Sequence, residues 1–378
     1  MKIRLSALDR FLQRAERAIA LLDRCRPLNY RDELLRLLRV WQSGSECSAS
    51  FRYAPSPDLS DLRARLLLLA RGLSGSPGVG TLYAERALEL ESEARTAESI
   101  DTPELSAAAR RRYPLSAAEE ESASACVDRF LTRAEAGGKR DAPTHRSDDD
   151  SDPGSLISCL QRSVGSLRLP VRIELVPDLV STAAATNDGR LWVRAGVEHT
   201  DVEVRRLVLH ELEGHVLPRL RARRESLGLF AVGTAQGSED EEGRALLLEE
   251  RAGLLDAQRA VELALRHRAA SAVREGADFV DIARALQRTG ATLPEALQIT
   301  ARAYRGGGLA REIVYLPALI RVRDAFSAEP ELEHWLERGR ISVRAARCLE
   351  GVGDAPELLE IEEPLLFGKE LGDQAVSE

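Results

Sequence analysis

The chain contains no apolar run long enough to cross a membrane, and no apolar signal-peptide core follows its N-terminus. Its five cysteines are odd in number, widely scattered and without a C-x-x-C pair, as is usual for reduced thiols. The net charge of -8 argues against a general basic face for nucleic-acid phosphates. We therefore expect a cytoplasmic globular protein that binds neither membrane nor nucleic acid.

Lysine and histidine are also scarce. Of the 53 basic residues only three are lysine, so an arginine by itself carries little information. There are only 6 histidines in the chain of 378 residues, so a pair of them close together stands out. A hydrophobic content of 44% and a charged content of 30% allow a sizeable core in one large or two modest domains.

Two of the histidines bracket a glutamate in residues 209–215, L-H-E-L-E-G-H. In the zinc-peptidase motif H-E-x-x-H the two ligands lie one helical turn apart on one face. Here the histidines are one residue further apart, which on a regular α-helix separates them by about 140°. Both rings can reach one metal only if the helix widens or ends locally, and we expect Gly214 to permit this. From these residues alone, two ordinary histidines on an amphipathic helix remain an equal alternative.

The residues before this segment predict the start of its helix. Thr200 and Glu203 have the spacing of a capping box, so the helix should begin near Asp201. A second capping box is expected downstream at Ser238 and Glu241.

Acidic residues near the second box supply candidates for a third metal ligand. Glu242 stands one turn before Leu246, where an apolar stripe begins, and can therefore point inward. Glu249 lies seven residues later on the same face and can orient a ligand from behind. Carboxylates also favour the positive end of a helix dipole, which accounts equally well for most of this acidic run.

The ordered motifs resemble those of a known family, the microtubule-associated tyrosine carboxypeptidases and their bacterial relatives, the flavohemoglobin expression-modulating QEGLA-motif proteins. Most of residues 1–345 takes part in the resemblance. The similar segments are residues 210–215, which match H-E-x-x-x-H; 241–245, which match Q/E-E-G-L-A; 233–235, a preceding Gly-Thr; 302–316, which match an Arg-Gly-Gly, Phe-Thr-Lys-Asp and Tyr-Leu run; and, more weakly, 51–53 and 82–83.

The resemblance implies a zinc metallocarboxypeptidase that removes a C-terminal residue from a peptide or protein. It implies His210, His215 and Glu242 as ligands of Zn²⁺, and Glu211 as general base and acid for attack by metal-activated water. Two other functions stay open: a non-catalytic helical interaction or regulatory protein that retains the fold, and an endopeptidase that uses the same zinc site.

Four further residues are candidates for contacts with the substrate. Tyr304 and Tyr315 are candidate donors to the oxyanion, with amphipathic core tyrosines as the alternative. Arg305 and Arg311 are candidates to bind the free carboxylate of the substrate, with solvated surface charge as the alternative. The sequence Ala-Arg-Glu at 310–312 replaces the family's Thr-Lys-Asp, which leaves the choice of substrate open. The tubulin-tyrosine preference of eukaryotic relatives belongs to particular members and is not carried over, because nothing in this sequence marks a tubulin-binding surface.

We expect a predominantly helical α+β fold with a zinc metallopeptidase-like core. Alternation at 171–176 and the stretch 190–194 after a turn predict a small sheet just before the metal-binding helix. Apolar periodicity predicts two helices within residues 6–48 and further helices at 58–74, at 82–110 and from 245 to about 349. The expected regions are an N-terminal helical region, 1–133; an acidic linker or mobile loop, 134–155; a catalytic core, 156–349; and a C-terminal tail, 350–378.

Overall fold

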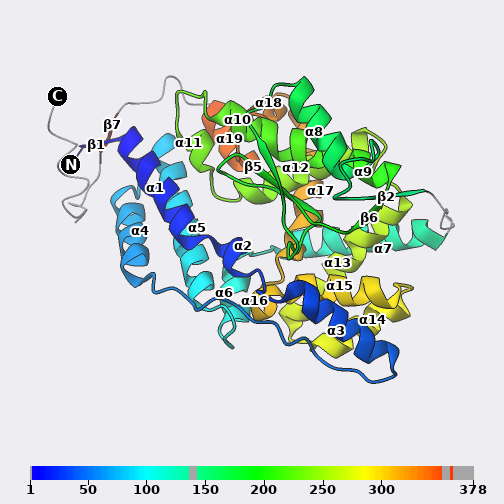
Figure 1. Ribbon diagram of the computed structural model, residues 1–378. Coiled ribbons are helices and arrows are strands. Elements are labelled where there is room, and N and C mark those ends of the chain that lie inside the picture. The colour runs from blue at the N-terminus through cyan, green and yellow to red at the C-terminus, as the bar shows by residue number, and fades with distance from the viewer. Residues whose placement is uncertain (1, 136–142, 351–357, 361–378) are drawn as a thin grey trace.

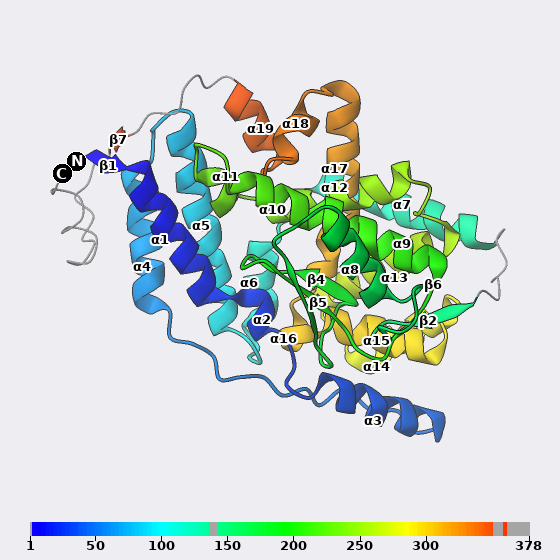
Figure 2. The ribbon, with the colours of Figure 1, turned by 45° about the horizontal axis from the view of Figure 1, so that its top comes forward.

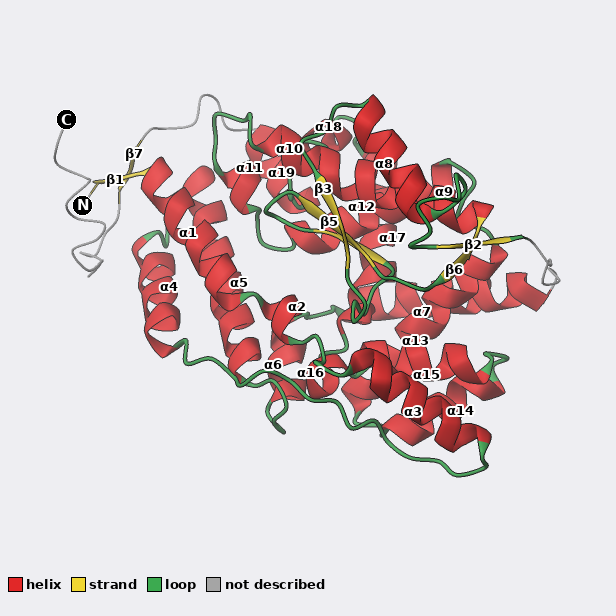
Figure 3. Cartoon of the chain, viewed as in Figure 1, coloured by secondary structure: helices red, strands yellow, loops and turns green. Residues whose placement is uncertain are grey.

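A computed structural model describes residues 2–135, 143–350 and 358–360. The fold is predominantly helical with small sheets, as expected for the α+β class (Figure 3). Among the described residues no helix is both long enough and apolar enough to span a membrane. The first elements are β1 (Lys2–Arg4), α1 (Leu5–Ile19), α2 (Leu21–Arg24), α3 (Tyr30–Gln42), α4 (Ser60–Gly72), α5 (Val79–Glu98), α6 (Leu105–Arg112) and α7 (Ala117–Glu135).

The predicted helices of this N-terminal part are confirmed, although residues 82–110 fold as two helices, α5 and α6. Helix α1 forms because its apolar residues recur every three or four positions and make one buried stripe. This stripe contacts α5, and α4 lies along α5 as well (Figures 1 and 2). Helix α3 lies apart from them and packs on α15.

The elements that follow position the cleft described below. Most helical predictions from residue 245 onward are confirmed by α13 and later helices. In chain order the elements are β2 (Thr144–Arg146), α8 (Leu156–Ser166), β3 (Arg172–Leu175), β4 (Ala183–Ala185), β5 (Arg190–Val193), β6 (Glu198–Thr200), α9 (Asp201–Leu209), η1 (His210–Val216), α10 (Leu217–Ala222), α11 (Leu229–Val232), α12 (Gly237–Arg251), α13 (Ala257–Glu275), α14 (Phe279–Arg288), α15 (Leu293–Ala303), α16 (Arg305–Gly308), η2 (Arg311–Val314), α17 (Tyr315–Ala328), α18 (Leu332–Leu336), α19 (Val343–Glu350) and β7 (Leu358–Glu360).

The small sheet expected before the helix with the histidine motif is present. Its strand order is β3-β5-β4, with β3 parallel and β4 antiparallel to β5. Strands β3 and β5 fall within the predicted segments, whereas β4 was not predicted, because three successive alanines carry no strand pattern. Strand β4 forms one edge of this sheet and contacts η1.

One large apolar cluster joins the two regions that the sequence separated at residues 134–155. It contains buried side chains from α1 and α5 together with side chains from α12, α13 and α17. A second cluster lies between α3, α14 and α15, and a third between α8, β5, α9 and η1. The N-terminal helices therefore share a hydrophobic core with the rest of the fold.

The expected linker, 134–155, is folded where it is described. Strand β2 pairs with β6, and the His145 ring contacts carboxylate oxygens of Asp152 and Asp201 at 2.6 and 3.0 Å. Residues 136–142 lie outside the described residues. Of the expected tail, 350–378, only Glu350 and residues 358–360 are described, and β7 pairs with β1.

Candidate active site

The histidine motif lies in a π-helical turn. Helix α9 starts at Asp201 behind the predicted capping box, in which the Glu203 amide donates to the Thr200 hydroxyl and Glu203 reaches back. It then passes into η1, where the wider turn brings residues five apart onto one face. The Nε2 atoms of His210 and His215 consequently lie 3.2 Å apart. The predicted local distortion of the helix is confirmed.

Gly214 contributes to this turn in a different way from the one expected. Its φ lies outside the positive range that favours glycine, so unusual backbone angles are not the reason for glycine here. A Cβ atom at this position would instead lie 2.7 Å from the Cβ of Ala245 on α12. The absent side chain lets η1 and α12 approach closely, and this approach brings the candidate ligand side chains of the two helices together.

The second capping box, at Ser238 and Glu241, is wrong. Helix α12 begins at Gly237, so Ser238 lies inside it, and its hydroxyl donates to Glu239. The close packing at the first residue of α12 requires glycine, because a Cβ at Gly237 would overlap the Arg340 carbonyl oxygen at 1.9 Å. Glu241 is free to turn towards His215 instead.

Three donor atoms converge where η1 faces α12. The Glu242 Oε2 atom lies 3.5 Å from His210 Nε2 and 3.7 Å from His215 Nε2. Donor atoms of these three residues all lie within 4.8 Å of one another, and both histidines are buried. The other such group in the described residues, Glu329, Glu331 and Glu350, lies on the surface. The structure thus brings together the three candidate ligands that the family resemblance implies.

Each histidine has a carboxylate and an arginine behind it. His210 Nδ1 lies 2.7 Å from Glu249, as the shared helix face suggested, and Arg259 pairs with the same carboxylate at 3.0 Å. His215 Nδ1 lies 3.0 Å from Glu241.

Arg219 pairs with this second carboxylate at 2.8 Å. The Glu241 and Arg219 contacts were missed, because the acidic run at 239–242 gives no sign of which carboxylate faces which histidine. Such outer contacts fix the ring orientation of a ligand and raise its basicity.

The buried carboxylates of Glu242 and Glu249 favour a positive charge at the point where the donor atoms converge. Burial alone would lower the pKa of His210, but the contacts with Glu242 and Glu249 raise it to about 10. Burial would raise the pKa of Glu249, yet Arg259 and His210 hold it at about 2. Burial is likewise outweighed at Glu242, where His210, His215 and Arg311 keep the pKa well below its usual value. The same carboxylates would stabilise a bound cation.

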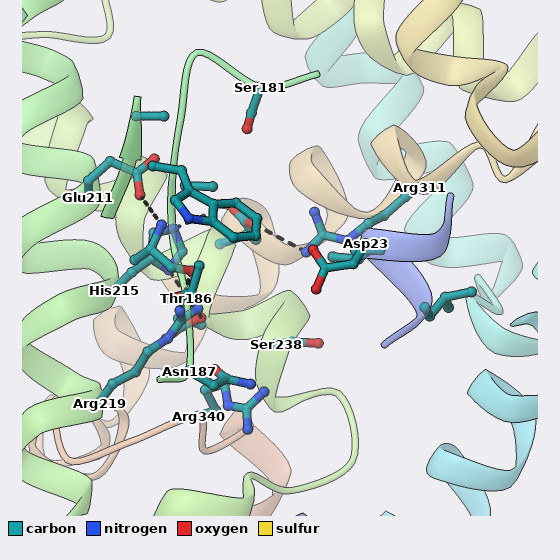
Figure 4. A pocket seen from close by; sticks show the side chains of 18 of the residues that line it. Asp23, Ser181, Thr186, Asn187, Glu211, His215, Arg219, Ser238, Arg311 and Arg340 are labelled. Atoms are coloured by element: carbon teal, nitrogen blue, oxygen red, sulfur yellow. Dashed lines mark hydrogen bonds and ion pairs between the residues drawn. The ribbon is translucent and has the colours of Figure 1, made fainter. Parts of the chain in front are cut away.

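Glu211, which lies between the two histidines, is held by the edge strand β4. Its Oε2 atom accepts a hydrogen bond from the Ala185 amide at 2.9 Å, and Arg219 Nη1 donates to the Ala185 carbonyl at 2.5 Å. Both groups face η1, because in an antiparallel pair alternate residues direct their backbone groups away from the partner strand. Figure 4 shows Glu211, His215 and Arg219 along one wall.

These side chains line a cleft of about 790 Å³. Its walls include α1 and α2, residues 179–188 around β4, and the elements η1 and α12. Further lining residues come from α13, α15, α16 and η2. Arg311 points towards the histidine wall from the other side (Figure 4). The convergent donors therefore lie in a cavity large enough for a peptide end rather than in a closed core.

The structure brings three of the four predicted substrate contacts to this cleft. Tyr315 OH lies 3.4 Å from Glu242 Oε1 and accepts a hydrogen bond from Arg311 Nη1 at 2.9 Å. Arg305 also lines the cleft.

Arg305 and Arg311 are only 7% and 8% exposed, so the solvated alternative is wrong for both. Tyr304 is not brought to the cluster. Its hydroxyl donates to the Ala277 carbonyl and its ring packs on Phe279, as the core alternative suggested.

Buried histidines, glutamates and arginines that converge in one cleft mark a candidate active site. The chain belongs to the microtubule-associated tyrosine carboxypeptidase family, whose model matches residues 41–356.

Comparison with solved structures gives a similarity to "the putative lipoprotein from Colwellia psychrerythraea", with a TM-score of 0.47 and 13% sequence identity. The alignment covers 72% of this chain but only 60% of that one. Comparison with curated proteins gives no match.

Proposed function

We propose that the protein is a zinc-dependent metallocarboxypeptidase with His210, His215 and Glu242 as metal ligands. The distances among their donor atoms carry this proposal. Zinc binds nitrogen and oxygen ligands at roughly 2.0–2.1 Å in a tetrahedron, in which neighbouring donors are about 3.3 Å apart. The separations of 3.2, 3.5 and 3.7 Å are close to that value. Two imidazoles and one carboxylate also suit zinc in peptidases.

When bound, zinc would supply an acidified water molecule and polarise the scissile carbonyl. Glu211 is the residue that moves the proton. Because its Oε2 accepts from Ala185, the carboxylate is oriented, and Oε1 can take a proton from the attacking water and pass it to the leaving amine. Tyr315 OH lies beside the ligand Glu242 and would donate to the developing oxyanion.

Strand β4 would hold the substrate backbone. The bonds from Arg194 to Thr182 and from Thr186 to Arg190 show that Ala183, like Ala185, directs its backbone groups away from β5. Ala183 lines the cleft, so its N–H and C=O face an extended peptide lying there. This arrangement supports hydrolysis of a peptide end rather than of a small amide.

A C-terminally diverse peptide library, analysed by mass spectrometry, tests the proposal. We expect zinc at about one equivalent in the purified protein and loss of C-terminal residues from the peptides. Glu211→Gln should retain the zinc and lose turnover. Equal peptide shortening by the wild type and this variant would refute the role of Glu211.

Two comparisons separate the alternative functions. Peptides with amidated C-termini should be resistant, whereas an endopeptidase would cleave amidated and free peptides alike. For a non-catalytic interaction protein, zinc would be absent, and adding zinc would change the thermal stability of His210→Ala and wild type equally. Either result would replace the proposed function by the corresponding alternative.

A further inference from the structure

A carbonyl group of the widened turn lacks a main-chain donor. The Leu217 amide donates to the Leu212 carbonyl, five residues earlier, as in a π-helix. The next residue is Pro218, which has no N–H to donate. The Glu213 carbonyl would need the amide of residue 217 in an α-helix, or that of residue 218 in a π-helix. Neither amide is available to it.

Pro218 also disfavours a regular helix at this point. It is buried and lies in the first turn of α10, directly after η1. A proline ring within a helix collides with the carbonyl four residues earlier, which here belongs to Gly214, and that carbonyl also loses its α-helical donor. Widening of the turn relieves the collision but restores neither lost donor. Gly214 is buried, and a buried carbonyl without a donor destabilises the fold.

Arg244 on α12 supplies a donor to both carbonyls. Its Nη2 atom donates to the Glu213 carbonyl and, at 2.9 Å, to the Gly214 carbonyl. The side chain is only 3% exposed, and within the described residues all its hydrogen bonds go to these two carbonyls. Arg244 does not line the cleft, in contrast to Glu241 and Glu242 on the same helix. Arg244 can therefore affect the site only through the backbone of η1.

These hydrogen bonds determine how His215 projects from the turn. The Gly214 carbonyl is part of the peptide bond to His215, so a guanidinium group that holds this carbonyl fixes the plane of that peptide. The distance of 3.2 Å between the His210 and His215 Nε2 atoms requires the widened turn, because in a regular α-helix the two side chains would point about 140° apart.

We propose that Arg244 is a positioning residue that keeps the histidine turn widened, so that His215 stays on the same face as His210. Pro218 excludes the regular arrangement, and Arg244 satisfies the carbonyls that lose their donors. The inference rests on the proposed metal centre and extends it to a side chain that contributes none of its donor atoms. Arg244 acts beside the close approach of Gly214 and its neighbour Ala245.

Four proteins test this proposal: the wild type, Arg244→Met, Pro218→Ala and the variant with both substitutions. Each would be measured for zinc affinity by competition with a chelator and for stability by urea unfolding. Arg244→Met should bind zinc roughly 10–100-fold more weakly, the usual range for loss of a contact that orients a ligand, and should unfold at a lower urea concentration. Pro218→Ala retains Arg244 and should bind zinc as tightly as the wild type.

The double variant separates positioning from stability. An alanine at position 218 would offer its N–H to the Gly214 carbonyl in the α-helical register. The double variant should therefore recover urea resistance relative to Arg244→Met. Its zinc affinity should stay low, because the regular register turns His215 away from His210. Recovery of both properties together would show that Arg244 has a structural role alone, and would contradict the proposal.

Two further variants complete the comparison. Arg244→Lys keeps a donor and should bind zinc more tightly than Arg244→Met but more weakly than the wild type, so it decides the question if Arg244→Met does not fold. As a control, Arg63→Met removes an arginine that pairs with Glu91 and Glu98 outside the cleft, at 3.0 and 2.8 Å. This variant should be less stable and bind zinc normally.

Unchanged zinc affinity in the Arg244 variants, or an equal loss in Arg63→Met, would overturn the inference and leave the proposed function intact. A wild-type protein that binds no zinc would overturn both.

Discussion

Replacement of Gly214 by alanine tests the geometry of the proposed metal centre, because it leaves the three proposed ligand residues themselves unchanged. The added Cβ would lie 2.7 Å from the Cβ of Ala245, whereas carbon atoms pack comfortably at roughly 3.5–4.0 Å. To relieve this overlap η1 and α12 must separate by about 1 Å. Such overpacking costs about 1–3 kcal/mol, from which a gain of roughly 0.5–1 kcal/mol from replacing a helical glycine is subtracted.

The same separation would move Glu242 away from His210 and His215, because the ligands lie on the two helices that are pushed apart. We therefore expect Gly214→Ala to be less stable to urea and to bind zinc at least 10-fold more weakly, on the order of the effect of disturbed supporting contacts. The two properties would be measured by chemical unfolding and by competition with a chelator.

The double variant Gly214→Ala/Ala245→Gly provides the control, since it removes the second carbon of the overlap. It should recover zinc affinity, although Ala245→Gly by itself costs about 1 kcal/mol of helix stability. If Gly214→Ala binds zinc normally, or if the double variant binds no better than the single one, the close approach of these helices does not set the ligand geometry.

Three further results are expected. Glu249→Gln and Glu241→Gln should each weaken zinc binding by roughly 10–100-fold in a chelator titration, and unchanged affinity would exclude an orienting role. Tyr315→Phe should lower kcat while Tyr304→Phe leaves it unchanged, which steady-state assays of both variants would check. Burial lowers the pKa of His267 to about 4, so the unfolded chain binds the extra proton between pH 6.5 and 4 and stability falls as the pH decreases through this range. The loss should approach about 3 kcal/mol, and His267→Gln should reduce it in urea unfolding at several pH values.

Local signals in the sequence predicted the helical part of the site well. The capping box at Thr200 and the one-residue excess in the histidine spacing depend on backbone geometry within a few residues, and both expectations agree with the structure. Glu249 was also found, because its position relative to Glu242 follows from the helical period alone.

Contacts between elements that are far apart in the sequence were not predicted, for a physical reason. Nothing in residues 183–185 indicates a strand, because alanine has little preference for strands. The position of strand β4 beside Glu211 depends on its pairing with β5. The capping box expected at Ser238 failed because α12 begins one residue earlier, at Gly237, which packs against Arg340, over 100 residues away in the sequence. The burial of Arg305 and Arg311 likewise depends on helices that a reading along the chain cannot bring together.

The contact between Glu211 and strand β4 has a consequence for which substitutions this cleft can tolerate. The carboxylate is fastened to the amide of Ala185, a group that every residue except proline provides. Substitutions along this strand can therefore reshape the cleft beside it while Glu211 keeps its place. The position of Glu211 thus depends on the main chain of β4, whereas the shape of the cleft depends on the side chains of β4. The two can change independently.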